Sequence, residues 1–73
     1  MRKKKCRIEN WSIIHDDEGL PFKLKGNIFG HPGGAEGAFG RSSKIVDLDV
    51  EAGVCETLNT TYELGVRDPE EGL

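Results

Sequence analysis

The stretch FKLKGNIF, residues Phe22–Phe29, alternates apolar and polar side chains. Phe22, Leu24 and Ile28 fall on one face, whereas Lys23, Lys25 and Asn27 fall on the other. A two-residue period is typical of a β-strand that buries one face in a core. Gly26 belongs to the apolar face, where a missing side chain permits a sharp bend or a close crossing of two strands. The stretch therefore predicts one strand of a strongly bent sheet.

The preceding stretch, CRIENWSIIH from Cys6 to His15, is also rich in β-branched and aromatic residues. Cys6 and Ile8 share one face, but Trp11 and Ile13 share the other. An uninterrupted strand would not change faces, so we expect a bulge or bend near Asn10.

Three further strands are predicted at residues 41–50, 54–58 and 61–66. In the first of them, Val46, Leu48 and Val50 are expected to point inward, with Asp47 and Asp49 outward. Gly53 follows in a tight connection that requires a positive φ.

The chain of 73 residues has room for one domain, and no segment shows a sustained 3.6-residue period. Five short strands predict an all-β fold: a small five-stranded antiparallel barrel of the SH3 or OB kind, or a strongly twisted sheet. The predicted organisation is a basic N-terminal arm (residues 1–5), a single β domain (6–66) and an acidic C-terminal tail (67–73).

Charge is distributed unevenly along the chain, whose net charge is −3. From Ile8 onward, five Lys and Arg residues face thirteen Asp and Glu residues, a net of −8. A body this acidic is repelled by phosphate backbones, which makes nucleic acid a less favoured partner. With no signal peptide, no spanning segment and no Cys-x-x-Cys pair, we expect a cytoplasmic protein whose Cys6 and Cys55 are reduced.

The longest stretch without a period is GHPGGAEGAFG, residues Gly30–Gly40. Its glycines expose backbone N–H groups, and cationic and hydroxyl side chains follow directly, as in an anion-binding concavity. The candidate ligand-binding residues are His31, Gly33, Gly34, Arg41, Ser42, Ser43 and Lys44. If strand alternation holds here, Arg41 and Ser43 form the pair that faces an outer-surface or intersubunit pocket. A flexible hairpin loop without a ligand is the alternative.

The sequence does not support nucleotide hydrolysis, nucleophilic catalysis or metal binding. A phosphate-binding loop of the Walker type would need a glycine at Ala35 and a lysine at Arg41, and a helix after them. Ser42 and Ser43 lack the context of an activated nucleophile. Since no catalytic motif is present, the sequence predicts neither an enzyme nor a cofactor. It also predicts no metal site, because the available cysteines and histidines lack the close spacing of zinc ligands. Trp11 and Tyr62 could stack on a ligand, but a core position is favoured in so small a domain.

Four short motifs carry a resemblance. They are Leu24-Lys25-Gly26, Gly30-His31-Pro32, Ser42-Ser43-x-Ile45 and Tyr62-x-Leu64-Gly65. Together they resemble small, mostly uncharacterised proteins of bacteriophages and prophages, although Gly33-Gly34-Ala35 stands where those proteins carry a larger residue. The resemblance implies a phage-encoded accessory protein in a bacterial host cell. Such proteins often inhibit host defence by blocking a host protein or by sequestering a signalling nucleotide.

Three functions remain open from the sequence. The leading hypothesis is a non-catalytic accessory protein that binds a small anionic, nucleotide-like ligand and forms a homo-oligomer, since a core this small gains stability from association. The second is a protein–protein inhibitor whose acidic face, including Asp47, Asp49, Glu51 and Glu56, docks on a host protein or mimics nucleic acid. The third is a small nucleic-acid-binding barrel.

Overall fold

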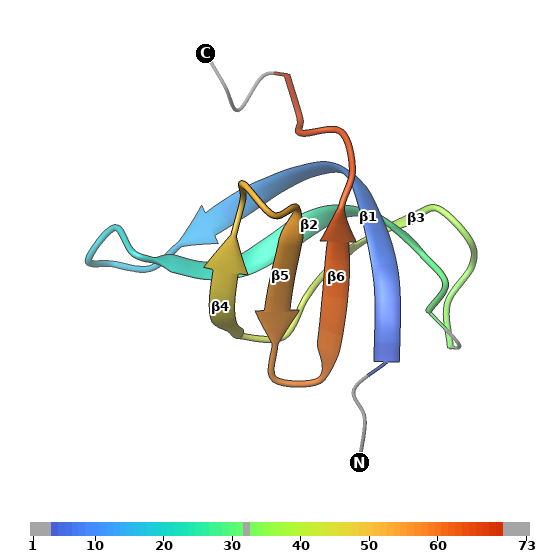
Figure 1. Ribbon diagram of the computed structural model, residues 1–73, viewed down its shortest axis with the longest axis horizontal. Helices are drawn as coiled ribbons and strands as arrows, with labels where there is room; N and C mark the ends of the chain where they lie inside the picture. The colour runs from blue at the N-terminus through green and yellow to red at the C-terminus, as the bar shows by residue number, and fades with distance from the viewer. Residues whose placement is uncertain (1–3, 32, 70–73) are drawn as a thin grey trace.

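The chain forms six β-strands, and the computed structural model describes residues 4–31 and 33–69 (Figure 1). The strands are β1 (Lys4–His15), β2 (Pro21–Phe29), β3 (Ala38–Arg41), β4 (Ile45–Asp49), β5 (Val54–Thr57) and β6 (Thr60–Leu64). No described residue is helical, and so no helix in these ranges is long and apolar enough to cross a membrane. The all-β prediction is confirmed.

The six strands make one mixed sheet in the order β3-β2-β1-β6-β5-β4. β1 and β6 run parallel, while every other neighbouring pair is antiparallel. The sheet curls until β4 lies near β2, but β3 and β4 remain its two unpaired edges. Of the two predicted alternatives, the five-stranded antiparallel barrel is therefore wrong in strand number, in strand direction and in closure. The sheet is open, as in the other alternative, but it has six strands and is mixed.

The extra strand, β3, lies mostly in the predicted loop: Ala38, Phe39 and Gly40 were expected to lack regular structure, and only Arg41 belongs to the predicted strand 41–50. The rest of that predicted strand begins only at Ile45, after a break at Ser42–Lys44. Ser42 is buried, and its Oγ accepts a hydrogen bond from the Leu24 amide (2.8 Å) and donates one to the Ser43 carbonyl (2.7 Å). These bonds hold the chain in a short crossing from one edge of the sheet to the other. β3 and β4 therefore lie at opposite edges of the sheet, and the predicted strand 41–50 is shortened to Ile45–Asp49.

The predicted bulge at Asn10 is present. The pairing of β1 with β2 shifts between Glu9 and Ser12, and Asn10 has a φ of 51°, in the left-handed region that asparagine tolerates better than most residues. The extra residue turns Trp11 to the same side of the sheet as Ile8. One long strand can therefore bury both of its halves in a single core.

The core lies inside the curl of the sheet. Its buried apolar side chains are Cys6, Ile8, Trp11, Leu24, Cys55 and Tyr62. Trp11 and Tyr62 are each only 3% exposed, so the core alternative is confirmed for both aromatic residues. Six such side chains form a small core, in keeping with the length of the chain.

Residues in β4 depart from the predicted alternation. A second irregularity shifts the pairing between Ile45 and Asp47, so Ile45 and Leu48 pack against the core while Val46 is 55% exposed. Val50, 47% exposed, lies in the turn after β4. The prediction that Val46 and Val50 point inward is wrong, because a bulge adds one residue to the two-residue period.

The chain ends differ from the predicted boundaries. Lys4 and Lys5, expected in the basic arm, pair with Thr60 and Thr61 of β6. Past β6, residues 65–68 form a strap across β1: the Gly65 amide donates to the Ile8 carbonyl at 2.8 Å, and further bonds follow at Trp11. Residues 1–3 of the predicted arm, Pro32, and residues 70–73 of the predicted tail lie outside the described residues.

Candidate functional site

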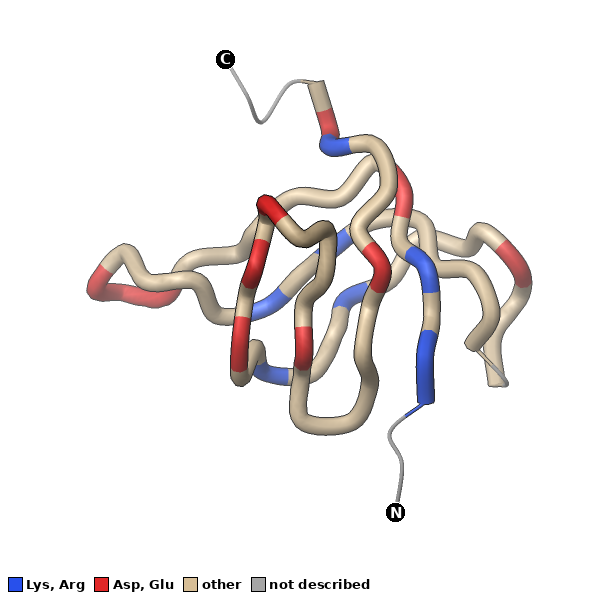
Figure 2. The backbone as a smooth tube through the Cα atoms, viewed as in Figure 1, with Lys and Arg blue, Asp and Glu red and all other residues tan. Residues whose placement is uncertain are grey.

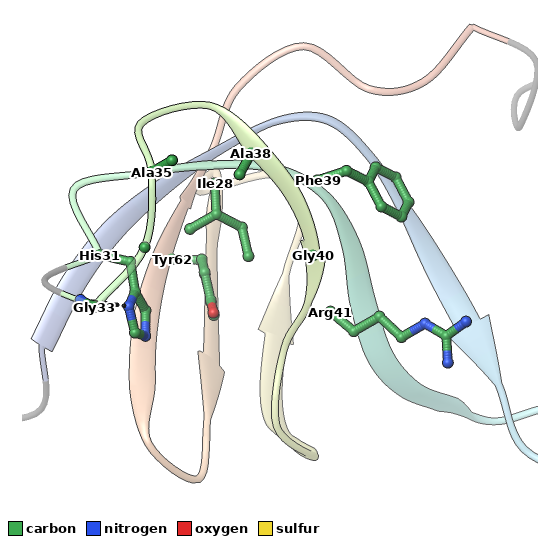
Figure 3. Close-up of a pocket in the computed structure, with 10 residues that line it drawn as sticks. Ile28, His31, Gly33, Ala35, Ala38, Phe39, Gly40, Arg41 and Tyr62 are labelled. Carbon is green, nitrogen blue, oxygen red and sulfur yellow. Dashed lines mark hydrogen bonds between the residues drawn. The ribbon is translucent and has the colours of Figure 1, made fainter.

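One pocket of about 240 Å³ opens where the loop after β2 folds over β3 and β6 (Figure 3). It is lined by Ile28, His31, Gly33, Gly34, Ala35, Ala38, Phe39, Gly40, Arg41 and Tyr62. Four of the seven residues predicted to bind a ligand are in this set: His31, Gly33, Gly34 and Arg41. The pocket therefore lies at the predicted loop.

The lining side chains do not all face the pocket. Ile28, His31 and Tyr62 converge on the hollow, whereas Phe39 and Arg41 project to the other side of β3 (Figure 3). Alternation along β3 explains this arrangement, because Ala38 and Gly40 occupy the inward positions. The two smallest side chains of β3 thus leave the space that forms the pocket.

His31 is fixed at the rim by its own loop. Its Nδ1 accepts a hydrogen bond from the Gly33 amide at 3.2 Å, and its carbonyl accepts one from the Gly34 amide, also at 3.2 Å (Figure 3). In the neutral ring, an accepting Nδ1 leaves the proton on Nε2. His31 can therefore present an N–H donor to a ligand.

Tyr62 forms the back of the pocket, and its hydroxyl points into the hollow (Figure 3). Burial, with smaller contributions from the neighbouring Cys6 and Cys55, raises the pKa of this phenol above its ordinary value, and a side-chain hydrogen bond with Thr60 opposes part of that rise. The hydroxyl consequently stays protonated at neutral pH and can donate or accept a hydrogen bond.

The loop amides are largely engaged inside the protein. The Gly30 amide donates to the Glu36 carboxylate at 2.6 Å, and the Gly37 amide donates to the Ile28 carbonyl at 2.8 Å. The Ala38 amide donates to the Ala35 carbonyl at 3.1 Å. A cradle built from all the loop N–H groups, as the glycine content suggested, is therefore not what the fold provides. The polar groups that converge on the pocket are side chains.

The remaining candidates lie outside the pocket lining. Ser42 holds the crossing between β3 and β4, as described above. The Ser43 hydroxyl donates to Thr57 Oγ1 at 2.9 Å and accepts from the Asn59 amide at 3.2 Å. Lys44 is exposed, and its carbonyl accepts from the Leu58 amide. Both hydroxyls hold the corner of the sheet together, and a ligand contact for these three residues stays a prediction.

Six lining residues were not predicted from the sequence: Ile28, Ala35, Ala38, Phe39, Gly40 and Tyr62. Ile28 was assigned to the apolar face of its strand and Tyr62 to a core position, and both assignments are correct. A curled sheet, however, leaves part of its inner face uncovered at the edge strand. The small residues Ala38 and Gly40 were the available signal for that gap.

A second, shallower hollow of about 300 Å³ lies beside β1 and is lined by Lys5, Cys6, Arg7, Phe29, Gly30 and Glu63. Its cations are already paired: Lys5 Nζ lies 2.9 Å from Glu63 Oε1, and Arg7 contacts the Glu9 carboxylate. These ion pairs make it a weaker candidate for an anionic ligand than the first pocket.

Within residues 4–31 and 33–69, no group of three or more His, Cys, Asp and Glu side chains is arranged to hold a metal ion. Compared with protein-family models, with curated proteins and with solved structures, the chain matches none.

Proposed function

We propose that the protein is a non-catalytic binding protein that takes a small anionic, nucleotide-like ligand in the pocket between His31 and Tyr62. The observation that carries the proposal is the convergence of the His31 ring and the Tyr62 hydroxyl on a hollow floored by Ile28. An apolar wall with a few fixed polar groups is the usual form of a small-molecule site.

The size of the pocket indicates how such a ligand would bind. Its volume of about 240 Å³ is below the roughly 300–1,000 Å³ of sites that enclose whole drug-sized ligands. A heteroaromatic ring would enter the pocket, and its charged substituent would stay outside the rim. Arg41 is the cation of the pocket lining, but its side chain projects to the outer side of β3, so it would have to turn back over Gly40 to make a charge-assisted, often bidentate contact with a phosphate.

The biological setting follows from the resemblance to phage and prophage proteins. Binding without catalysis fits an accessory protein that sequesters a signalling nucleotide in the cytoplasm of a bacterial host. Such a role requires affinity alone, which agrees with the lack of a catalytic motif in the sequence.

Titration calorimetry with a panel of nucleoside monophosphates, cyclic nucleotides and inorganic phosphate tests the proposal. We expect a nucleotide to bind more tightly than inorganic phosphate, and Tyr62→Phe and His31→Ala to weaken that binding. Arg41→Ala should cost about 1.5–3 kcal/mol, the usual contribution of a hydrogen bond to a charged group.

Two controls are built into the chain. His15 is an exposed histidine at the far end of β1, so His15→Ala should leave binding unchanged, and so should Lys23→Ala on β2. Absence of binding across the panel, or equal effects of His31→Ala and His15→Ala, would remove the pocket as the ligand site.

The second candidate is a protein–protein inhibitor that uses its acidic face. Asp47 and Glu56 are direct partners across β4 and β5, and Asp49 lies on the same strand as Asp47. A basic host protein would bind this face with a strong salt dependence and without any effect of His31→Ala.

A further inference from the structure

The outer surface of β2 and β3 carries a basic face, which we define as Lys23, Lys25 and Arg41 with the aromatic ring of Phe39. Lys25 and Arg41 are direct partners across the two strands, and Asn27 is the partner of Phe39. Phe39 is 67% exposed, which is unusual for a large aromatic side chain in the middle of a strand. An exposed ring beside cations is a common centre of a protein interface.

The outer surface of β4 and β5 carries an acidic face, which we define as Asp47, Asp49 and Glu56 with Val54. Asp47 pairs with Glu56 and Asp49 pairs with Val54, so the four residues are contiguous on adjacent strands. Val54 is 38% exposed, and Asp47 and Asp49 are both exposed. This face has the same composition as the basic face, with an apolar centre among charges, but the opposite sign.

The curl of the sheet keeps the two faces apart. Both lie on the convex outside, and β4 turns its inner side toward β2. Acidic residues gather on β4 and β5, whereas basic residues lie on β2 behind them and on β1 beside β6 (Figure 2). The molecule therefore cannot neutralise one face with the other.

We infer that the basic face of one copy docks on the acidic face of a second copy, with Phe39 packing against Val54. A second copy fits better than nucleic acid, because the chain as a whole is acidic and repels a polyanion. Since each copy has one basic and one acidic face, the contact between copies is head-to-tail. Every face finds a partner only if the copies close into a ring.

Sedimentation velocity at low and high salt tests the inference on the full chain. Wild-type protein should associate at low salt. At high salt its dissociation constant should rise by at least about tenfold, because salt screens the exposed charges of the two faces. Two double variants then separate the faces. Asp47→Lys with Asp49→Lys makes both faces basic, and Lys23→Glu with Lys25→Glu makes both faces acidic.

Each double variant alone should be monomeric, and an equimolar mixture of the two should associate again. This mixing result is specific to head-to-tail pairing of these faces. Phe39→Ser, which alters no charge, should also weaken association. Phe39, Asp47 and Asp49 are exposed, whereas Lys23 and Lys25 are half-buried, and Asp49 Oδ1 also accepts a hydrogen bond from the Ala52 amide at 3.0 Å. Circular dichroism and thermal unfolding therefore check that each variant keeps the wild-type fold before its association is compared.

The matched control is Asp17→Lys with Glu18→Lys in the exposed turn between β1 and β2, which should leave association intact. A wild-type protein that is monomeric at low salt overturns the inference. So does failure of the mixture to reassociate, or a control variant that dissociates as fully as the two face variants.

Discussion

Gly26 of β2 lies so close to Glu9 of β1 that a Cβ at position 26 would be 2.8 Å from the Glu9 carbonyl oxygen. The same Cβ would be 3.0 Å from the Trp11 Cα, so backbone surrounds it on both sides of the Asn10 bulge. Backbone atoms cannot turn away as a side chain does. The bulge in one strand and the glycine in the next are therefore two parts of one bend.

This contact predicts that Gly26→Ala destabilises the fold by more than about 2 kcal/mol, since β1 and β2 must separate to admit the methyl group. Urea unfolding followed by tryptophan fluorescence measures the change. Gly34→Ala is the matched control: nothing lies within 4 Å of its Cβ position, so we expect a change within about 0.5 kcal/mol. Similar values for the two variants would contradict the close approach.

The hydroxyl of Ser42 gives a second prediction. Ser42→Ala removes the acceptor of the buried Leu24 amide, which should cost about 1–3 kcal/mol of stability. Lys44→Ala, two residues on, should cost little because its side chain is exposed. If Ser42→Ala instead kept full stability and lost nucleotide affinity, the hydroxyl would be a ligand contact, as the sequence motif suggested.

The strap over β1 should open at low pH. The Val66 amide donates to the Glu9 carboxylate at 2.6 Å, and this bond, with a smaller contribution from Arg7, lowers the pKa of Glu9. A lowered pKa means that the fold favours the charged carboxylate. The contribution of Glu9 to the stability of the strap is therefore fully present above the ordinary carboxyl pKa, and it is lost as the pH falls through the lowered pKa of Glu9. The protection factor of the Val66 amide, which corrects for the intrinsic pH dependence of exchange, should fall as the pH drops below the ordinary carboxyl pKa, while the protection of amides in β2 is retained.

Glu9→Gln should produce part of the same loosening at neutral pH, because the amide side chain cannot pair with Arg7. Glu18→Gln in the exposed turn is the corresponding control. Unchanged protection of Val66 in Glu9→Gln would show that the strap depends on its backbone bonds alone.

The two thiols should be inert in the native state. Burial, together with nearby Asp47, raises the pKa of Cys55 from 9.0 to about 11, and burial also raises the pKa of Cys6. A raised pKa favours the neutral thiol, so stability should decline as the pH rises from about 9 to about 11. Cys55→Ser should flatten that decline, and iodoacetamide should label both thiols only after unfolding.

A disulfide between these cysteines is excluded by the order of the strands. Tyr62 of β6 is the direct partner of Cys6 on one side and of Cys55 on the other. Two strand spacings of about 4.8 Å separate the cysteine α-carbons by roughly 9–10 Å, beyond the reach of a disulfide. Oxidation should therefore leave the intact monomer without an internal crosslink by mass spectrometry.

Much of the local structure could be predicted from the sequence, because face alternation is a local property. The inward positions of Leu24 and Ile28, the bulge at Asn10 and the positive φ of Gly53 (73°) all follow from neighbouring residues. Phe22 was predicted to share that inward face but is not part of the core, because the pairing of β1 with β2 shifts again between Ile14 and His15. The parallel pairing of β1 with β6 does not, since alternation assigns faces and not partners.

The break at Ser42–Lys44 was hidden for a related reason. Hydroxyl residues fit a strand pattern, and only the long-range bonds to Leu24 and Thr57 show that they form a corner. The pocket was located by its loop, but the groups that define it come from strands distant in sequence. The sequence predicted His31 as a ligand-binding residue, but it could not predict that Tyr62 lies opposite His31.

The parallel pairing of β1 with β6 has a consequence for how the protein is made. β1 is synthesised first, yet one of its two sheet neighbours is the last strand to be formed, and the strap that covers Trp11 comes later still. A nascent chain that has not yet extended past Asp68 has an open edge along β1 and an uncovered indole. Stable folding on the ribosome must therefore wait until Asp68 has been synthesised, and the high contact order of the finished sheet favours slow folding for a domain of this length.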